Sequence, residues 1–517
     1  MRTGKWSGVK LIISGFILFL LIYFYMFAGA QLWASCAPLI VGLCIAYPLN
    51  IMINRFDKHD PLYNRKIIRN QIIHKVVCAA AATILLVAIL VFVFGFLAPQ
   101  LTACVIALLD KVRTRLDEAV WSQEAMQIVM DVKARGYEAV KEYAERLDGA
   151  EPRELDPQEL EDAVDRLDSP LLRALEHAAK NIYDYQTRLL IESRNWETSV
   201  AGGNVGQLVR GLHRVAIYVP NLPGTCVSAV LMNAIPARVA GVEEIVLVTP
   251  PAEQISDTLL SAAWVAGVDR VIAMSGAQAV AALAYGADWI PKADKLVGVM
   301  DQSVRTAAAL VGQAMDVAMT EANRDLCIIA DEAANPVYAA ADLLSQAERS
   351  ATSAAILLTP SEALANAVLE ELERQSGALR RKAVMHQSLG EYGGVVLCQD
   401  LEGCITLANR LAPANLELLT AAPLALLDQI VNAGCVYLGA GSPEALGEYA
   451  AGPCSGVPVA GRAAYASALN VTDFQKRTNL VKFNEAALEK VAQDIINLSR
   501  AEEMTANANA VKVRQGK

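Results

Sequence analysis

Residues 228–251, SAVLMNAIPARVAGVEEIVLVTPP, hold the pattern that decides the fold. The run EIVLVT at 244–249 is short and rich in β-branched residues, which predicts a strand. Similar runs occur on both sides of it. We predict strands at 215–219, 244–249, 270–274, 295–299, 326–330, 354–358, 394–398 and 434–438, with helical stretches such as 277–285 and 338–349 between them.

Strands that alternate with helices of 10–15 residues are typical of βαβ units and a parallel sheet. The chain is therefore predicted to be α/β. This number of strands fits two Rossmann-like lobes better than one sheet, and a barrel is the alternative. Residues 122–195, which precede the first of these strands, show the periodicity of amphipathic helices.

The charge of the chain is unevenly distributed. The 517 residues carry a net charge of −10, but residues 1–115 contain 12 Lys and Arg against three Asp and Glu. The remaining residues therefore carry −19, which is a poor match for a phosphate backbone. The charge pattern excludes nucleic acid as a partner.

The first part of the chain has the composition of a membrane segment. No charged residue occurs from Leu11 to Asn54, and a second uncharged run covers 76–109. A helix needs about 20 apolar residues to cross a bilayer. We therefore predict three spans at 11–29, 33–53 and 76–97, a membrane region over 1–115 and a soluble domain over 116–517. The expected localisation is multi-pass membrane, with the side of the soluble domain left open.

The membrane segment also resembles the start of the autoinducer exporter family of membrane proteins. The resemblance rests on Pro-Leu-Asn at 48–50 and Leu-Ala-Pro-Gln-Leu at 97–101. The further spans of such a transporter are absent, so an anchor is the favoured interpretation and a transporter subunit the alternative.

Residues 122–514 resemble histidinol dehydrogenase over nearly their whole length. The resemblance is carried by VAIYVP (215–220), GAQAVAALAYGADWIPKADKLVG (276–298), ADLLSQAE (341–348), GSPEALGEYAAGP (441–453) and DFQKRTNLVKF (473–483). It implies two incomplete Rossmann-type lobes and a small C-terminal tail. It also implies a homodimer in which the tail completes the partner's site, and NAD-dependent oxidation of L-histidinol with zinc and a Glu-His acid–base pair.

The positions that carry this chemistry are substituted. Ala414 and Asn415 stand where the family has its Glu-His pair, so no intact catalytic residue is expected. The four family positions that bind zinc are occupied by Gln346, Arg349, Glu448 and Asn507. A guanidinium is a permanent cation and cannot ligate a metal, so zinc binding is not expected. A different metal site made of Cys454, Glu448 and Gln346 is the alternative.

Other positions match ligand-binding residues of the family only in part. The expected NAD-binding residues are Tyr218, Gln278 and Asp301, and the expected substrate-binding residues are Arg324, Glu444, Ser455 and Glu502. The leading hypothesis is a membrane-anchored, catalytically degenerate histidinol dehydrogenase homologue that binds or regulates. The alternative is an active NAD-dependent dehydrogenase acting on L-histidinol or a related amino alcohol. The identity of the ligand is left open.

Overall fold

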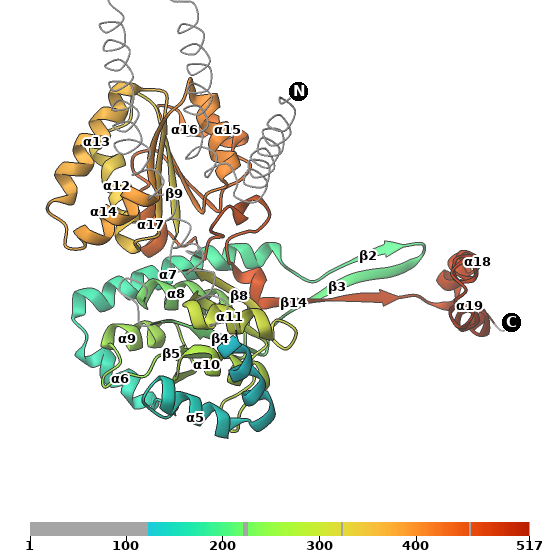
Figure 1. The fold of residues 1–517 in the computed structure, drawn as a ribbon. Helices are drawn as coiled ribbons and strands as arrows, with labels where there is room; N and C mark the ends of the chain where they lie inside the picture. Colours follow the sequence, from blue (N-terminus) through green and yellow to red (C-terminus); the bar gives the residue numbers. More distant parts are fainter. Residues whose placement is uncertain (1–122, 221–225, 322–323, 454–455, 516–517) are drawn as a thin grey trace, which may run out of the picture. The chain divides into compact units, whose positions relative to one another are not determined.

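The computed structural model describes residues 123–220, 226–321, 324–453 and 456–515 (Figure 1). The chain divides into two compact units, Met1–Val120 and Trp121–Lys517. The three predicted spans and the predicted boundary at 115/116 lie outside the described residues. Within the described part of the chain, no helix combines the length and apolar character that crossing a membrane requires.

The first lobe is built on a six-stranded sheet in the order β1-β6-β5-β4-β7-β8. All neighbours are parallel except β1 and β6. The strands are β1 (Arg153–Glu154), β4 (Arg214–Tyr218), β5 (Glu244–Thr249), β6 (Arg270–Ala273), β7 (Lys295–Met300) and β8 (Asp316–Glu321). The chain winds from β4 through β5 to β6, then returns to the other side of β4 with β7. The strand order therefore reverses between β4 and β7, which is where doubly wound sheets bind ligands.

Alternate residues of these strands enter two different cores. Val215, Ile217 and Leu247 pack on the face covered by α6 (Pro157–Arg166), α7 (Ser169–Glu192), α8 (Cys226–Val239) and α9 (Asp257–Val265). Ala216 and Tyr218 pack on the opposite face with α5 (Tyr137–Leu147), α10 (Gly276–Tyr285) and α11 (Gln302–Val311). Since side chains alternate along a strand, a run apolar at every position is buried on both faces.

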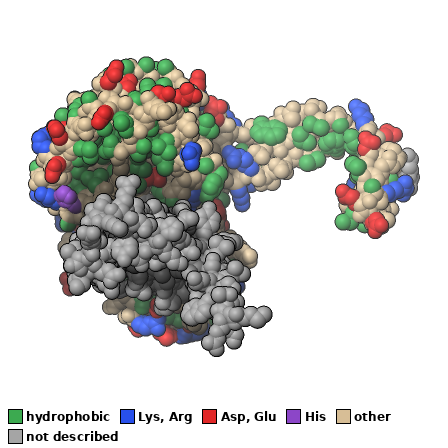
Figure 2. Space-filling model, turned by 45° about the horizontal axis from the view of Figure 1, so that its top comes forward, with side chains coloured by type: hydrophobic (Ala, Val, Ile, Leu, Met, Phe, Trp, Pro, Cys, Tyr) green, Lys and Arg blue, Asp and Glu red, His purple; other side chains and the backbone are tan. Residues whose placement is uncertain are grey.

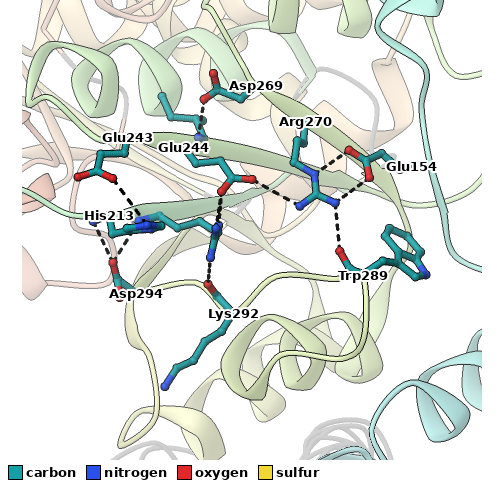
Figure 3. Close-up of polar contacts among 11 residues, drawn as sticks. Glu154, His213, Glu243, Glu244, Asp269, Arg270, Trp289, Lys292 and Asp294 are labelled. Carbon is teal, nitrogen blue, oxygen red and sulfur yellow. Dashed lines mark hydrogen bonds and ion pairs between the residues drawn. The ribbon is translucent and has the colours of Figure 1, made fainter.

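Ion pairs tie together the amino ends of the first-lobe strands (Figure 3). Arg214 and Glu244 meet at 2.5 Å, and Arg270 contacts Glu244 at 3.4 Å and Glu154 at 2.6 Å. Asp294 accepts hydrogen bonds from the backbone amides that start β4. This network holds the sheet at the edge opposite its ligand-binding edge.

The second lobe repeats this topology. Its five strands are all parallel, in the order β11-β10-β9-β12-β13. They are β9 (Asp325–Ala330), β10 (Ala354–Thr359), β11 (Gly393–Leu397), β12 (Asn415–Leu419) and β13 (Cys435–Leu438). The helices α12 (Pro336–Arg349), α13 (Glu362–Ser376) and α14 (Lys382–Glu391) pack on one face. The other face is covered by α15 (Leu401–Leu411) and α16 (Pro423–Leu426), and α17 (Glu444–Tyr449) follows β13.

A ribbon of three antiparallel strands leads to the C-terminal tail (Figure 1). It consists of β2 (Trp196–Val200), β3 (Gly203–Gly211) and β14 (Gln475–Lys482), in the order β14-β3-β2. The tail is α18 (Glu485–Ala501) and α19 (Thr505–Lys512), which pack on each other. Figure 2 shows hydrophobic side chains along the ribbon and charges of both signs on the tail.

The predicted α/β class and the two Rossmann-like lobes are confirmed, and a barrel is excluded by the two separate sheets. Each predicted strand is present, with ends that agree within one residue. The prediction missed β8, β12, the short β1 and the three strands of the ribbon.

Candidate functional site

The first group of candidate residues lies where the strand order of the first lobe reverses. Tyr218 is the last residue of β4 and is fully buried. Its hydroxyl donates a 2.8 Å hydrogen bond to Asp301 Oδ2. Asp301 is in turn the N-cap of α11, because its Oδ1 accepts from Val304 N and from the Ser303 hydroxyl. Burial, and then the negative charge of Asp301, raise the pKa of Tyr218, so the phenol stays protonated and remains a donor.

A glycine permits the backbones of β4 and β7 to lie close together at Tyr218. Gly298, in β7, has a φ of +111°, and a Cβ atom there would lie 2.1 Å from the Tyr218 carbonyl oxygen. Any larger residue would force β4 and β7 apart at the switch point.

Gln278 is the third candidate of this group. It lies in the first turn of α10 and is fully buried. Its Nε2 donates to Asp148 at 3.1 Å, and Asp148 also accepts from the amide and hydroxyl of Ser275. Among the described residues, Gln278 Oε1 has no hydrogen-bond partner. A buried acceptor without a partner is costly unless a ligand satisfies it. The chemistry of this edge therefore fits a dinucleotide.

The second group lies at the amino ends of the second-lobe strands. Asp342, Gln346 and Arg349 occur at spacings of four and three residues on α12, which places them on one helix face. Leu416 and Leu418 pack toward α15, so the alternate residues of β12 face α12.

Arg349 is the central cation of this group. It forms an ion pair with Glu448 and lies 3.7 Å from Glu444 Oε1, and the three side chains are 13%, 4% and 2% exposed. Burial, together with the nearby Arg324 cation, lowers the pKa of Arg349 to about 10, so it remains charged at neutral pH. Two carboxylates out of water require such a counter-charge.

The two residues predicted to stand at the family's acid–base positions, Ala414 and Asn415, are buried near these groups. Ala414 is fully buried, and Asn415 Nδ2 lies 3.5 Å from Glu444 Oε1. Tyr437 donates to Asn415 Oδ1 at 3.4 Å. Ala414 and the Asn415 amide have no group that titrates near neutral pH, and burial raises the pKa of the Tyr437 phenol. None of these three side chains can therefore exchange a proton near neutral pH.

A buried carboxyl pair lies beside them. Glu417, on β12, is hydrogen-bonded to Asp342 and accepts the backbone amide of Glu444 at 2.6 Å. Burial, and then repulsion by Asp342, raise the pKa of Glu417 to about 9, while burial raises the pKa of Asp342 to about 6. The pair is therefore protonated in part at neutral pH and holds the N-terminus of α17.

The residues present do not fit the zinc ion that the family resemblance implies. Arg349, at a predicted zinc-ligand position, carries a positive charge. The described residues contain no group of three or more His, Cys, Asp or Glu side chains placed to hold a metal. Gln346 is fully buried beside it, and neither polar atom of its amide has a hydrogen-bond partner among the described residues. No described residue satisfies the donor or the acceptor of this buried amide.

The remaining predicted residues are dispersed. Arg324 is 9% exposed just before β9 and close enough to Arg349 to affect it. Glu502 and Asn507 are exposed residues of the tail, and Ser455 lies outside the described residues. Sequence reasoning did not single out Asp148, Asp342, Glu417 or Ser228, although Ser228 and Asp342 lie within the quoted stretches 228–251 and 341–348. The Ser228 hydroxyl, in the first turn of α8, donates to Glu448 and so links the two groups.

Fold and site together define a two-lobed α/β protein of Rossmann type, with an edge whose chemistry fits a dinucleotide in one lobe and a cluster of buried polar residues in the other. The histidinol dehydrogenase family profile matches residues 111–515, and the chain belongs to the histidinol dehydrogenase family. It is 42% identical over 406 residues to a histidinol dehydrogenase from Heliobacterium mobile, covering 77% of this chain and 95% of the relative. The corresponding protein of Aquifex aeolicus is 39% identical over 407 residues, with 78% and 94% covered.

A solved structure agrees with this assignment. The crystal structure of histidinol dehydrogenase from Elizabethkingia anophelis superposes with a TM-score of 0.72 at 31% identity, covering 76% of this chain and 92% of that one. The chain is therefore a homologue of NAD-dependent oxidoreductases, as the sequence resemblance implied.

These findings correct the predicted localisation. The family profile spans residues 111–515, and no helix in the described ranges has the length and apolarity of a membrane span. The match to the histidinol dehydrogenase family overturns the predicted multi-pass membrane localisation, which is withdrawn. The resemblance of the first residues to the autoinducer exporter family gains no support from these relatives.

Proposed function

We propose that the chain is an NAD-dependent dehydrogenase that oxidises L-histidinol or a related amino alcohol without a metal ion. The observation that carries the proposal is the dinucleotide edge, where Tyr218 is bonded to Asp301 and Gln278 Oε1 lacks a partner. The names of the relatives support the choice of substrate.

The reaction removes a hydride from the carbinol carbon and a proton from its hydroxyl. NAD, when bound, accepts the hydride. We assign the proton to Glu444, whose Oε2 has no hydrogen-bond partner among the described residues. Arg349 supplies a fixed positive charge to the oxygen from which the proton departs, and the Gln346 amide orients the amine of the substrate.

The test is NADH formation from L-histidinol by the full chain, followed at 340 nm with and without EDTA. The proposal expects turnover that EDTA leaves unchanged. Turnover that EDTA abolishes would contradict a metal-free reaction.

A second candidate is a binding or regulatory protein that has lost catalysis. It is favoured by Ala414 and Asn415, which hold no titratable group where the family has its acid–base pair. Loss of such a pair slows a reaction by about 10² to 10⁴. NAD binding to the full chain, measured by calorimetry, without detectable NADH would support this candidate.

We also propose that the chain forms a homodimer through the ribbon and tail. Trp196 and Val481 on the ribbon are 51% and 75% exposed, and Leu498 on the tail is 67% exposed. Large apolar side chains in this density are typical of an interface, and a second copy of the chain is the partner that the family resemblance implies.

A further inference from the structure

We propose that Arg349 is a built-in cation that replaces a divalent metal in the second lobe, and that Arg349→His alone opens this position to zinc. The inference concerns the site of the proposed function but does not need its reaction, since its test measures metal binding.

The contacts of Arg349 are those of a metal substitute. The Arg349 side chain contacts Glu444 and Glu448, both on α17. On α12, Arg349 follows Gln346 by one helical turn. The groups around Arg349 are thus the Gln346 amide and the Glu444 and Glu448 carboxylates, and all three kinds of oxygen can bind zinc. The guanidinium supplies the positive charge that keeps the two buried carboxylates compatible, as a metal ion would.

The unpartnered amide is a second, independent observation. Gln346 is 0% exposed, and neither its nitrogen nor its oxygen has a hydrogen-bond partner among the described residues. The Gln346 oxygen accepts no hydrogen bond from Arg349 or from any other described residue. The site therefore retains an oxygen donor that its present cation leaves unused.

A histidine at position 349 would favour zinc binding. Neutral imidazole is a zinc ligand, and it removes the fixed charge that now repels any cation. Together with Gln346 and Glu448 it would supply three protein ligands, which is the number that zinc sites with an open position use.

The experiment compares the full chain, Arg349→His and the control Arg374→His by zinc calorimetry and by the visible absorption of bound cobalt. Arg374 is a matched control because it also pairs with a glutamate, Glu371, but on the exposed face of α13. We expect about one equivalent of zinc on Arg349→His alone, at least about 100-fold tighter than on the other two proteins, with the cobalt band of a tetrahedral site.

Two results would overturn the inference. One is stoichiometric zinc binding by the unaltered chain, which needs no variant to be stable. The other is a folded Arg349→His protein that binds zinc no better than Arg374→His. Adding Glu448→Gln should abolish the gained binding, and its persistence would place the metal elsewhere. Absence of NADH formation bears on the proposed function and leaves these outcomes unchanged.

Discussion

The Ser228 hydroxyl donates a 3.0 Å hydrogen bond to Glu448 Oε1, across 220 residues of sequence. Ser228 belongs to α8, which follows β4 of the first lobe, and Glu448 belongs to α17 of the second lobe. The same carboxylate holds Arg349. One buried carboxylate therefore connects the dinucleotide side to the ligand cluster.

Ser228→Ala should lower the free energy of unfolding by about 1–3 kcal/mol, because it leaves a buried carboxylate oxygen without its donor. Urea denaturation of the full chain would measure this. Ser199→Ala removes a hydroxyl from an exposed residue of the ribbon and serves as the control. Equal losses for both variants would refute a special role for the Ser228 bond.

Tyr218→Phe should weaken NAD binding about tenfold, since Asp301 would lose its phenol donor at the dinucleotide edge. Calorimetry with NAD would report the change. Tyr285→Phe removes a hydroxyl from the far end of α10 and should leave the affinity unchanged. An unaltered affinity in Tyr218→Phe would show that NAD does not depend on this pair.

The carboxyl pair predicts a dependence of stability on pH. The pKa of Glu417 is about 9 and that of Asp342 about 6, both above their ordinary values near 4. The folded state therefore holds more protons than the unfolded one, and this contribution to stability is lost as pH rises from about 4.5 to 9. One proton corresponds to a slope of about 1.4 kcal/mol per pH unit.

Glu417→Gln should flatten this slope and raise stability relative to the unaltered chain at alkaline pH. Denaturation midpoints between pH 5 and 9 would show it. An unchanged slope in the variant would mean that other groups cause the dependence.

Arg270→Met should cost about 1–3 kcal/mol, because Arg270 joins two carboxylates and is only 23% exposed. Arg188→Met, whose ion pair with Glu192 is 67% and 69% exposed, should cost less than about 0.5 kcal/mol. Thermal unfolding of both variants provides the comparison, and similar shifts would argue against a role for the network at the strand starts.

Removal of the tail tests the proposed dimer. A chain that ends after β14 should change from dimer to monomer in light scattering coupled to size exclusion, since α18 and α19 would be missing from the interface. A monomeric unaltered chain would contradict the proposal. The charge-altering pair Trp196→Glu and Val481→Glu on the exposed ribbon should give the same change without truncation.

The strands that could be predicted are those built around a short, nearly continuous run of apolar residues. EIVLVT and LCIIA are buried on both faces, so their composition alone marks them. The strand β12, NLELL, was missed because Leu and Glu are good helix formers and because its polar residues face α12. The ribbon was missed because an exposed strand such as QKRTNLVK carries no apolar pattern.

Part of the candidate site could likewise be predicted from the sequence and part could not. Arg349 could be seen as a substitution that no metal tolerates, because that follows from the chemistry of a guanidinium. Its pairing with Glu448, and the link from Glu448 to Ser228, depend on how α12, α17 and α8 approach each other. The partners of these two contacts are 99 (448 − 349) and 220 positions apart, so the local sequence carries no signal of them.

The pairing of β14 with β3 has a consequence for synthesis in the cell. Gln207 and Asn479 are bonded across this pair although 272 residues separate them. At about 5–20 residues per second, a ribosome needs roughly 15–55 s to make the missing partner. During that time one edge of β3 is an unpaired template for other nascent chains. Polysomes crowded on one message should therefore favour misassembly, and slow initiation or chaperone capture of the emerging hairpin should raise the yield of correctly assembled protein.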